Sequence, residues 1–565
     1  MTSPASGVTL RGRKLCWRTD AMYADDPLSA WQGLLHMRGL SEGDDFFTPR
    51  LADLPDPDDM RDMKLASERL AAAIIQGEAI HVFGDFDADG VCGTAILVEA
   101  LRAAGAHVSC SIPHRAEQGH GIGVEPVRKA AGAGCQLGIS VDTGTTCFEA
   151  CDEAKRLGFD LIVSDHHLPE AALPDAFALL NPARPDCGFA NRRLCGTGVA
   201  FFLLMALWKR LAERGNKPTF DLRSLLDRVA VATVADVMEL IGVNRILVFH
   251  GLARLNAQPS VGMAALLSYV NGKKQVNAET IGFYLAPRIN AAGRMQHGEA
   301  AMRLLSTQDA DEAAMLAEDL DTSNKQRRQV EAEVFRQAQS KLEGSDVLAA
   351  YDAGWHAGVV GLAAGRLARK HGKPAAVGFV TPDGDIRISL RGRPGFHIGE
   401  LLNACGDHLA GFGGHAGAGG GTVREGAWSG FTQSFASAVA DQATHASDHL
   451  VSKIDGVLGL GAMHIGLAER LARFEPLGNG NPACAWMLKD MQITDRRDLK
   501  GGVLRLKLTD GAQWLDGIVF GANGLGEALQ PGQIISPIGT LQKDDWRGNG
   551  AIQFVIEDVL KAENL

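Results

Sequence analysis

The chain has 565 residues, and at about 150 residues per domain this length predicts roughly three to four domains. Hydrophobic residues make up 46% and charged residues 22%, values typical of globular proteins, which exclude collagen-like, disordered and membrane classes. The formal net charge of −11 excludes a uniformly basic nucleic-acid-binding surface, so a polyanionic partner would need local basic patches or bound metal.

The sequence shows no sign of export or membrane insertion. Its N-terminal residues lack the apolar core of a signal peptide, and its longest apolar run, 199–208, is about half a bilayer-spanning helix. The ten cysteines include no CxxC pair and do not have the spacing of metal ligands. We therefore expect a cytoplasmic protein without membrane contact, whose cysteines behave as small hydrophobic residues.

The first predicted elements follow an irregular N-terminal segment and alternate between strands and helices. Runs rich in apolar and β-branched residues predict strands at 79–84, 107–112, 137–141 and 160–164. Helical patterns lie between them at 91–104, 124–133 and 146–157. Because these strands are apolar on both faces and are separated by helices, the order predicts a parallel sheet covered on both sides.

The rest of the chain predicts three further parts. A helix-rich region ends in a long charged helix at about 309–342, whose charges fit either a solvated face or a connection between domains. A second α/β region with a glycine-rich segment follows, and alternating apolar residues from 503 onward predict a small antiparallel β barrel. The predicted divisions are an N-terminal segment (1–60), an α/β domain (61–300), a helical connector (301–345), a second α/β domain (346–455) and a barrel domain (456–565).

Acidic residues gather at the predicted strand ends. The segment GDFDADG (84–90) has three carboxylates at alternate positions, but an EF-hand calcium loop would need a glutamate where this chain has Ile96. The preceding strand and the following helix instead place these acids on a strand-to-helix turn. VDTGTT (141–146) and SDHH (164–167) follow two further strands at the same topological position.

These three segments predict a metal site. Ligands of a doubly wound sheet bind outside the carboxyl ends of its strands. One Asp at such an end is often a helix cap, but three clusters of Asp and His predict convergence in space. Close carboxylates repel one another unless a cation neutralises them. Two divalent cations about 3.5–4 Å apart clamp a phosphoryl group and activate water. We expect two Mn²⁺ ions, with Mg²⁺ as a substitute, because the ligands combine oxygen and imidazole.

The motifs resemble a known family. GDFDADG, VDTGTT and SDHH resemble three motifs of the DHH phosphoesterase superfamily. The resemblance narrows to its RecJ family of single-strand-specific 5′→3′ DNA exonucleases through PHRAEQGHGIG (113–123), GTGVA (196–200), RINAAGR (288–294), ISLRG (388–392) and GGHAGAG (413–419). The match runs in order over about 80–565, and the closing barrel is similar in position to that family's oligonucleotide-binding fold.

The resemblance implies a role for each matching position. The implied metal ligands are Asp85, Asp87, Asp142, His166 and Asp236, with Asp142 as the bridge. Asp89 and Asp165 are expected to orient ligands, Asp165 through the ring of its neighbour His166. The implied catalytic set is Asp87, Asp89, Asp142, Asp165, His166 and His167.

Two histidines keep alternative interpretations. His167 is expected to position the leaving group, to donate a proton or only to support the metal. His81 stands four residues before Asp85, where related pyrophosphatases carry a ligand, and is either a ligand or a strand-packing histidine.

Substrate contacts are assigned by the same resemblance. Arg115 and Arg391 are expected to bind a terminal phosphate, with Ser389 and the backbone of the glycine-rich loop at Gly414 as further donors. The other expected substrate contacts are Arg288, Asn290, Arg294, His356 and His415. In the barrel, Trp514 and Trp546 either stack bases or pack in the core.

The implied reaction is metal-assisted hydrolysis that shortens single-stranded DNA from its 5′ end and releases 5′-mononucleotides, in recombination and repair. The family implies a monomer that works with a RecQ-type helicase and a single-strand-binding protein. Two rivals are another DHH phosphoesterase, such as a pyrophosphatase or an oligonucleotide phosphatase, and a non-catalytic DNA-binding scaffold. The predicted barrel disfavours the first, and the complete set of acids disfavours the second.

Overall fold

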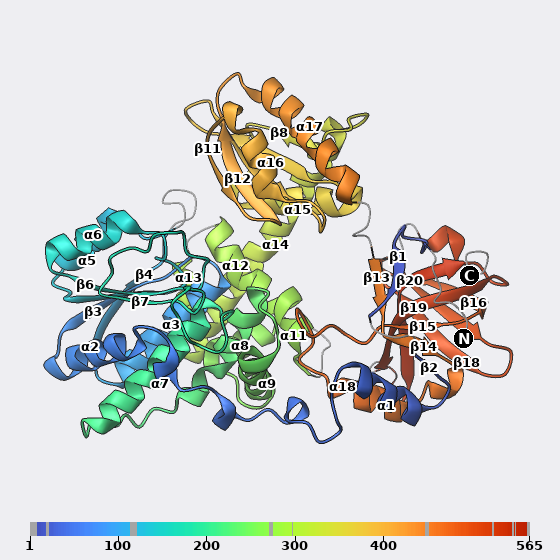
Figure 1. Cartoon of the computed structure of the whole chain (residues 1–565), viewed down its shortest axis with the longest axis horizontal. Coiled ribbons are helices and arrows are strands. Elements are labelled where there is room, and N and C mark those ends of the chain that lie inside the picture. The colour runs from blue at the N-terminus through green and yellow to red at the C-terminus, as the bar shows by residue number, and fades with distance from the viewer. Residues whose placement is uncertain are drawn as a thin grey trace.

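The computed structural model describes residues 8–18, 22–113, 121–270, 275–295, 298–446, 451–521, 525–544, 547 and 550–561. The chain forms three bodies (Figure 1). The first combines a parallel sheet with a helical region, the second is a smaller α/β domain, and the third is a β barrel, beside which both ends of the chain lie. This arrangement confirms the predicted fold class.

A parallel sheet of five strands organises the first body. Its strands are β3 (Ala79–Phe83), β4 (His107–Ser111), β5 (Leu137–Ser140), β6 (Asp160–Ser164) and β7 (Ala178–Leu180). The strand order is β4–β3–β5–β6–β7, and every pairing is parallel. The chain therefore leaves β3 toward one edge and later returns to its other side, which makes the β3/β5 boundary a topological switch point.

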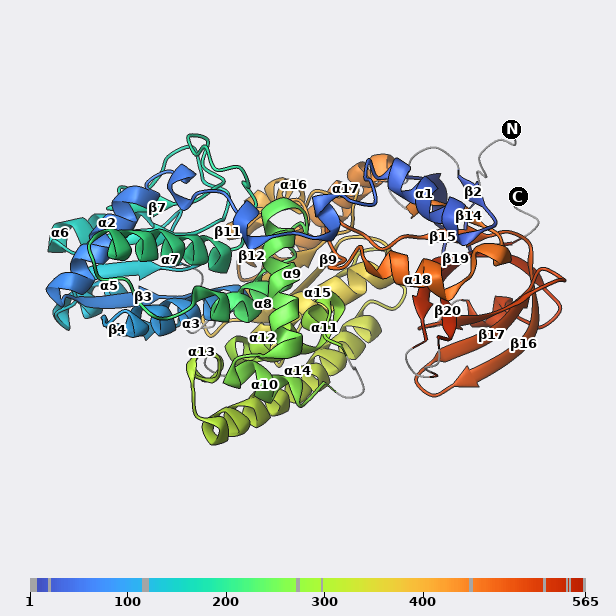
Figure 2. The ribbon, with the colours of Figure 1, turned by 90° about the horizontal axis from the view of Figure 1, so that it is seen from below.

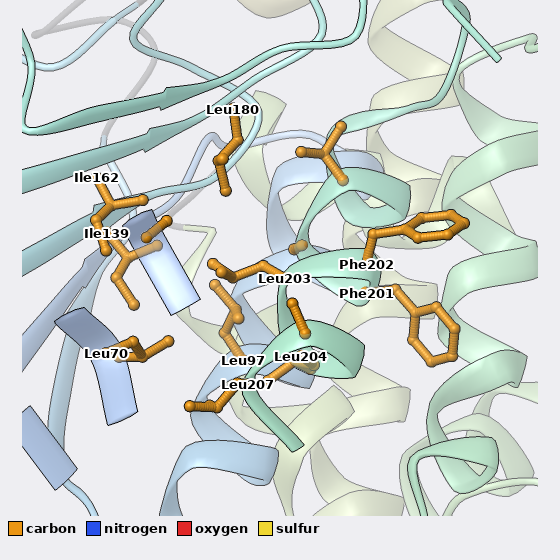
Figure 3. Close-up of a cluster of buried hydrophobic side chains, with 14 of the residues drawn as sticks. Leu70, Leu97, Ile139, Ile162, Leu180, Phe201, Phe202, Leu203, Leu204 and Leu207 are labelled. Carbon is orange, nitrogen blue, oxygen red and sulfur yellow. The ribbon is translucent and has the colours of Figure 1, made fainter. Parts of the chain in front are cut away.

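Helices cover both faces of this sheet. The helices of the first body that pack on the sheet are α2 (Met63–Gln76), α3 (Ala88–Ala103), α5 (Val124–Gly132), α6 (Phe148–Leu157) and α7 (Gly196–Glu213). Helices α2, α3 and α7 share one apolar core with the sheet, while α5 and α6 cover the opposite face. Figure 3 shows the first core, in which Leu70, Ile139 and Leu203 are fully buried.

A helical region extends the first body. It contains α8 (Leu226–Ala235), α9 (Gly242–Ala257), α10 (Val261–Leu267), α11 (Ala278–Thr280), the π-helical turn η5 (Ile281–Leu285), α12 (Ala286–Met295) and α13 (Glu299–Ser306). The long helix α14 (Ala310–Lys341) packs on α10, α12 and α13 and then reaches α15 of the second body (Figure 2). Asp309 caps α14 by accepting the backbone N–H groups of Asp311 and Glu312.

The second body is a mixed sheet between two helical layers. Its elements are β8 (Ala349–Tyr351), α15 (Ala357–His371), β9 (Ala375–Val380), β10 (Ile386–Arg391), α16 (Ile398–Ala404), β11 (Leu409–Gly414), β12 (Ala418–Val423) and α17 (Trp428–Ala446). The strand order is β11–β12–β10–β9–β8. Helices α14 and α15 share one apolar core with this sheet, and α16 and α17 share the other.

The third body contains a β barrel that is antiparallel except at one parallel strand pair. Its elements are β13 (Val451–Ile454), β14 (Gly456–Leu458), α18 (Ile465–Ala472), β15 (Trp486–Leu488), β16 (Met491–Leu499), β17 (Val503–Thr509), β18 (Trp514–Val519), β19 (Ile534–Lys543) and β20 (Ile552–Lys561). The order β16–β17–β18–β20–β19, together with a β16–β19 pairing, closes five strands into a barrel. The consecutive strands β19 and β20 pair antiparallel within it.

Most of the N-terminal segment belongs to this third body, which the sequence did not indicate, whereas Leu51 and Leu54 pack on the core of the first body. Strand β1 (Lys14–Trp17) pairs with β13, β2 (Tyr23–Ala24) pairs with β14, and α1 (Pro27–Met37) packs against α18. Trp31 of α1 is fully buried, and its ring contacts Phe474 edge-on with centroids 5.8 Å apart. Among the described residues, no helix is both long and apolar enough to cross a membrane.

Trp31→Ala tests this assignment of the N-terminal segment. Removing a fully buried tryptophan should lower the free energy of unfolding of the third body by about 3–5 kcal/mol, because a large cavity is left. Leu28→Ala is the matched control, since Leu28 lies on the same helix and is 52% exposed. The free energy of unfolding is measured in urea, with limited proteolysis as the probe of the folded fraction. Equal stability of the two variants would contradict the packing described here.

Candidate metal centre

The acidic and histidine side chains that follow β3, β5 and β6 lie together at one edge of the parallel sheet. Three groups of described residues have potential ligand atoms within 4.8 Å of one another. They are Asp85–Asp87–Asp142, Asp142–His166–His167 and Asp89–His166–Asp236. The predicted convergence is therefore confirmed, and it includes Asp236 at the end of α8. Asp142 and His166 each belong to two of the groups.

The turn after β3 is shaped to present two carboxylates. Asp87 is the N-cap of α3, and its Oδ1 accepts the backbone N–H groups of Asp89 (2.9 Å) and Gly90 (3.2 Å). Asp85, only 7% exposed, packs against the first turn of the same helix. A Cβ at Gly90 would lie 2.6 Å from the Cα of Asp85, so only glycine permits this approach.

Asp142 occupies an unusual backbone position after β5. Its φ of 62° lies in the left-handed region, which few residues other than glycine, Asn and Asp adopt. Its backbone N–H donates to the Ser164 carbonyl at 3.0 Å, which ties it to the end of β6. Gly196 closes over it, since a Cβ there would lie 2.6 Å from the Cβ of Asp142. This left-handed, crowded conformation places the buried carboxylate beside those of Asp85 and Asp87.

Asp89 joins α3 to α7, and both of its carboxylate oxygens already accept hydrogen bonds. Its two carboxylate oxygens accept the backbone N–H groups of Gly196 (2.6 Å) and Thr197 (2.8 Å), the first residues of α7. The Thr197 hydroxyl donates to the Asp89 carbonyl at 2.7 Å. The N-terminus of a helix stabilises a carboxylate placed there. This arrangement fits the orienting role that the sequence suggested for Asp89.

The ring of His166 lies among three carboxylates. Its Nε2 is 3.0 Å from the Oδ1 of Asp142, 3.5 Å from the Oδ2 of Asp236 and 3.7 Å from the Oδ2 of Asp89. These residues come from the ends of β5, β6 and α8 and the start of α3. His166 is therefore the imidazole at the centre of the cluster.

Asp165 organises the loop around it but orients a different ring from the one expected. Its Oδ1 accepts the ring Nδ1–H of His167 at 2.8 Å and the backbone N–H of His166 at 2.7 Å. Its Oδ2 accepts the backbone N–H of Thr145 at 2.8 Å. The expectation that Asp165 orients the His166 ring is therefore wrong, because the adjacent backbone N–H and the more exposed His167 ring occupy that oxygen.

The protonation of these groups reflects burial and crowding. Burial, together with repulsion from Asp89, Asp87 and Asp85, raises the pKa of Asp142 well above its usual range. Burial and the negative charges of Asp89 and Asp87 raise the pKa of Asp236 to about 8. The hydrogen bond to Asp165 raises the pKa of His167 to about 9, while burial lowers the pKa of His166. His167 is therefore cationic at neutral pH.

These residues fit a divalent cation. The Oδ1 of Asp142 and the Oδ2 of Asp236 are buried and accept no hydrogen bond from any described residue. Such oxygens are costly unless a cation or a proton satisfies them. A set of carboxylates with one central imidazole suits Mn²⁺ or Mg²⁺. Asp142 belongs both to the group with Asp85 and Asp87 and to the group with His166, so it is placed to bridge two metal ions.

The motif RINAAGR connects the acidic turn to the second body. Asn290 Oδ1 accepts the backbone N–H of Ala88 at 2.7 Å, and a Cβ at Gly293 would lie 2.5 Å from the Phe86 carbonyl oxygen. Arg294 donates to the Gly358 carbonyl at 3.3 Å. Arg288 forms an ion pair with Asp321 of α14, with a shortest N–O distance of 2.7 Å. Asn290 and Arg294 thus lie along a path from the acidic turn to α15.

The structure brings the phosphate-contact candidates of the second body onto neighbouring strands. Ser389 of β10 pairs with Gly420 of β12, which pairs with Gly413 of β11, and Arg391 lies two residues farther along β10. Ser389 and Arg391 face Gly361 of α15, where a Cβ would lie 3.1 Å from the Arg391 guanidinium.

Three other candidates of this group lie close to these strands. Gly414 is the last residue of β11, and the exposed His415 follows it. His356 caps α15 through its Nδ1, which accepts the Gly358 N–H at 3.0 Å.

Trp514 of the barrel is 59% exposed, and the centre of its ring lies 5.1 Å from the ammonium of Lys507, an arrangement compatible with stacking on a base. Arg115 and Trp546 lie outside the described residues.

Comparisons with known proteins agree with this geometry. The DHH family N-terminal domain matches residues 79–233, the DHHA1 domain matches 344–444, and the RecJ OB domain matches 454–558. The single-stranded-DNA-specific exonuclease RecJ of Dickeya dadantii is 36% identical over 87% of this chain and 89% of its own length. The chain belongs to the RecJ family. RecJ of Bacillus subtilis is 33% identical over 92% of this chain, which spans 66% of that longer relative.

Solved RecJ structures have a similar fold. RecJ of Thermus thermophilus in complex with Mn²⁺ superposes with a TM-score of 0.79 at 30% identity, covering 97% of this chain and 80% of that one. The same protein in complex with Mg²⁺ gives a TM-score of 0.73 at 29% identity. A further RecJ bound to manganese covers 69% of this chain at 35% identity, with a TM-score of 0.59.

Sequence reasoning overlooked one buried residue of this RecJ-family site. Asn181 follows β7 and is fully buried, and its Nδ2 donates to the Thr145 hydroxyl (2.9 Å) and to the His167 carbonyl (2.8 Å). It thereby joins the VDTGTT and SDHH segments. Its place directly after an apolar strand, at the same sheet edge as Asp85 and Asp142, was the signal that could have identified it.

His81 packs within the sheet. Its Nδ1 and Nε2 lie 2.8 Å and 2.9 Å from the hydroxyls of Ser109 and Ser111 on β4, and burial lowers its pKa to about 4. It belongs to none of the three groups of potential ligands among the described residues. The structure therefore favours the strand-packing interpretation over the ligand interpretation.

His81→Asn separates the two interpretations of His81. Because the folded-state pKa lies below the usual 6.5, the unfolded chain binds a proton first, and stability falls as the pH drops from 6.5 to about 4. The variant should lose part of this acid sensitivity in denaturant titrations and should bind Mn²⁺ with unchanged affinity at pH 7. A strong loss of Mn²⁺ affinity would show that His81 is a ligand.

Proposed function

We propose that this chain is a metal-dependent exonuclease that degrades single-stranded DNA from its 5′ end and releases 5′-mononucleotides. The observation that carries the proposal is the convergence of Asp85, Asp87, Asp142, His166 and Asp236 at the switch point of the sheet. The family supports the substrate, because the RecJ relatives are single-stranded-DNA-specific exonucleases. The proposal includes a cytoplasmic role in recombination and repair.

The metal site is proposed to hold two ions. Asp85, Asp87 and Asp142 would hold one, and His166 and Asp236 the other, with Asp142, which shares a group with His166, contributing to both. When bound, the two ions neutralise a phosphodiester and make water a stronger nucleophile. Asp89 fixes α3 against α7, and Asp165 fixes the SDHH turn, so the ligand atoms keep their spacing. Mn²⁺ is proposed as the preferred ion and Mg²⁺ as its substitute, as RecJ structures with both ions support.

His167 is proposed to act directly on the phosphate. Its Nδ1–H is held by Asp165, and this hydrogen bond raises its pKa to about 9. The centroids of the His167 and His166 rings are 4.6 Å apart, so His167 lies beside the central imidazole. Its Nε2–H is suited to donate to a phosphate oxygen or to the departing 3′ oxygen.

The second body is proposed to anchor the 5′ phosphate and so to set the polarity. Arg391 and Ser389 on β10 and the backbone of Gly414 on β11 offer a guanidinium, a hydroxyl and an N–H donor on two strands that are separated only by β12. His356, His415, Arg115 and Arg288 remain proposed contacts. Asn290 and Arg294 tie the anchor to the acidic turn through α12, which fixes the distance between anchor and scissile bond.

The wider context is also a proposal. We propose that the protein acts as a monomer, receives strands from a RecQ-type helicase and works beside a single-strand-binding protein. A pyrophosphatase or oligonucleotide phosphatase of the same superfamily is not favoured, because the barrel matches the RecJ OB domain. A non-catalytic scaffold is not favoured, because the full set of acids is present and converges.

Asp142→Asn tests the metal site. Replacing the shared carboxylate removes a charge that both ions need, so cleavage of single-stranded DNA with Mn²⁺ should fall on the order of 10³-fold or more, since even outer partners of metal ligands are worth about 10–100-fold. Asp152→Asn, on the surface of α6, is the matched control and should keep full activity. Retained turnover in Asp142→Asn would contradict the assignment.

Arg391→Ala tests the anchor and the polarity. Digestion of single strands labelled at either end should release the 5′ label first, as a mononucleotide. The variant should lose about tenfold in kcat/KM on 5′-phosphorylated strands and little on 5′-hydroxyl strands, because only the phosphate engages the guanidinium. Arg336→Ala removes an equal charge from α14 and is the control. An unchanged preference for 5′ phosphate would exclude Arg391 as the anchor.

A further inference from the structure

The turn that follows Asp236 has a conformation that its own residues do not favour. Asp236 ends α8, and the next two N–H groups close the helix, Val237 donating to Val234 (3.1 Å) and Met238 to Thr233 (3.1 Å). In this type of helix end the residue after the C-cap is left-handed and is usually glycine. Here it is Val237, with a φ of 57°. A β-branched residue is rare in this region, so the turn needs support from elsewhere.

That support comes from a segment of the third body, the loop of residues 474–481. The Nδ2 of Asn479 donates to the Val237 carbonyl at 3.0 Å, and the Leu240 N–H donates to the Asn479 carbonyl at 2.7 Å. The loop lies close along the same stretch, since a Cβ at Gly478 would be 2.7 Å from a methyl of Leu240. Asn479 therefore bonds both ends of the segment 237–240.

The loop itself is held rigidly against the first body. Arg245 of α9, only 3% exposed, donates to the carbonyls of Phe474 (3.0 Å) and Glu475 (2.8 Å). The buried Asn481 donates to the carbonyls of Phe474 and Pro476, both at 2.8 Å. The Arg245 bonds tie the start of the loop to α9, and the Asn481 bonds tie its end back to its start, with Asn479 between the two. The loop can therefore resist displacement of the turn that it contacts.

The supported turn carries one of the converging carboxylates. Asp236 is adjacent to Val237, and its buried Oδ2 lies 3.5 Å from the Nε2 of His166. Asp236 belongs to the group with Asp89 and His166 but not to the group Asp85–Asp87–Asp142. A small movement of the turn would therefore alter one group and leave the other intact.

We propose that the loop 474–481 is a positioning element for Asp236, with Asn479 as its positioning residue, so that docking of the third body sets the affinity of one of the two metal positions. The inference rests on the proposed function only in taking these carboxylates as metal ligands. It gives the C-terminal domain a second task besides contact with DNA. By linkage, metal bound at this position also stabilises the docking of the loop.

Asn479→Ala is the direct test, with Mn²⁺ binding as the readout. Free Mn²⁺ is measured by its electron paramagnetic resonance signal during titration of the whole protein without DNA. Wild type should show two classes of site, and the variant should weaken one class about tenfold and leave the other unchanged. Asn479 is exposed, so the variant should fold with an unchanged melting temperature before metal is added. Thr494→Ala, which removes a bond from an exposed hydroxyl to a carbonyl within the barrel, is the control.

A rescue variant separates positioning from a general structural effect. Val237→Gly removes the unfavourable left-handed valine, so the turn should keep its shape without the loop. Alone it should leave both Mn²⁺ affinities unchanged. Combined with Asn479→Ala, it should restore the weakened class to within about threefold of wild type, a coupling that a double-mutant cycle measures.

The outcomes distinguish this inference from the proposed function. Two intact Mn²⁺ classes in a folded Asn479→Ala variant would overturn the inference while leaving the nuclease proposal untouched. Equal weakening of both classes, or failure of Val237→Gly to rescue, would also overturn it. Absence of Mn²⁺ binding and nuclease activity in the wild type would instead refute the proposed function.

Discussion

The mutual repulsion of buried carboxylates at one sheet edge is the constraint on which the rest of the structure depends. The protein stabilises the negative charge of two of these carboxylates with its own hydrogen-bond donors. The first N–H groups of α7 donate to Asp89, and the His167 ring and backbone N–H groups donate to Asp165. It leaves Asp142 and Asp236 with raised pKa values and buried, unbonded oxygens in the described structure. Such an arrangement is stable only with protons or with cations, and the chemistry of the donors selects divalent metal ions.

Each later part of the chain reaches this edge through one short segment. Helix α12 bonds the acidic turn through Asn290 and meets α15 through Arg294. The loop 474–481 supports the turn that carries Asp236. The two other bodies are therefore joined to the site by direct hydrogen bonds, so that phosphate anchoring and barrel docking can both be coupled to the metal ligands. These direct hydrogen bonds explain how residues hundreds of positions apart in the sequence keep a fixed geometry at the site.

The parallel sheet and most of the acidic site were predictable from local sequence patterns, and the features that were not predictable have physical reasons. Apolar β-branched runs followed by Asp predicted the parallel sheet and its acidic edge, because strand direction alone brings Asp85, Asp142 and Asp165 together. Asp236 was found only through the family resemblance, since it ends a helix without any periodic signal. The ring that Asp165 orients was mispredicted, because hydrogen-bond geometry in a tight turn is not encoded by spacing. Pairing of β1 with β13 and support of Val237 by Asn479 depend on contacts across the whole chain, which no local pattern reveals.

The central claim is that these side chains hold a pair of divalent ions bridged by Asp142. Anomalous diffraction at the manganese absorption edge, from crystals grown with Mn²⁺, tests it most directly. The account predicts two peaks about 3.5–4 Å apart, one beside Asp85 and Asp87 and the other beside His166 and Asp236, with Asp142 between them. No peak at this edge of the sheet, or peaks confined to other surfaces, would contradict it.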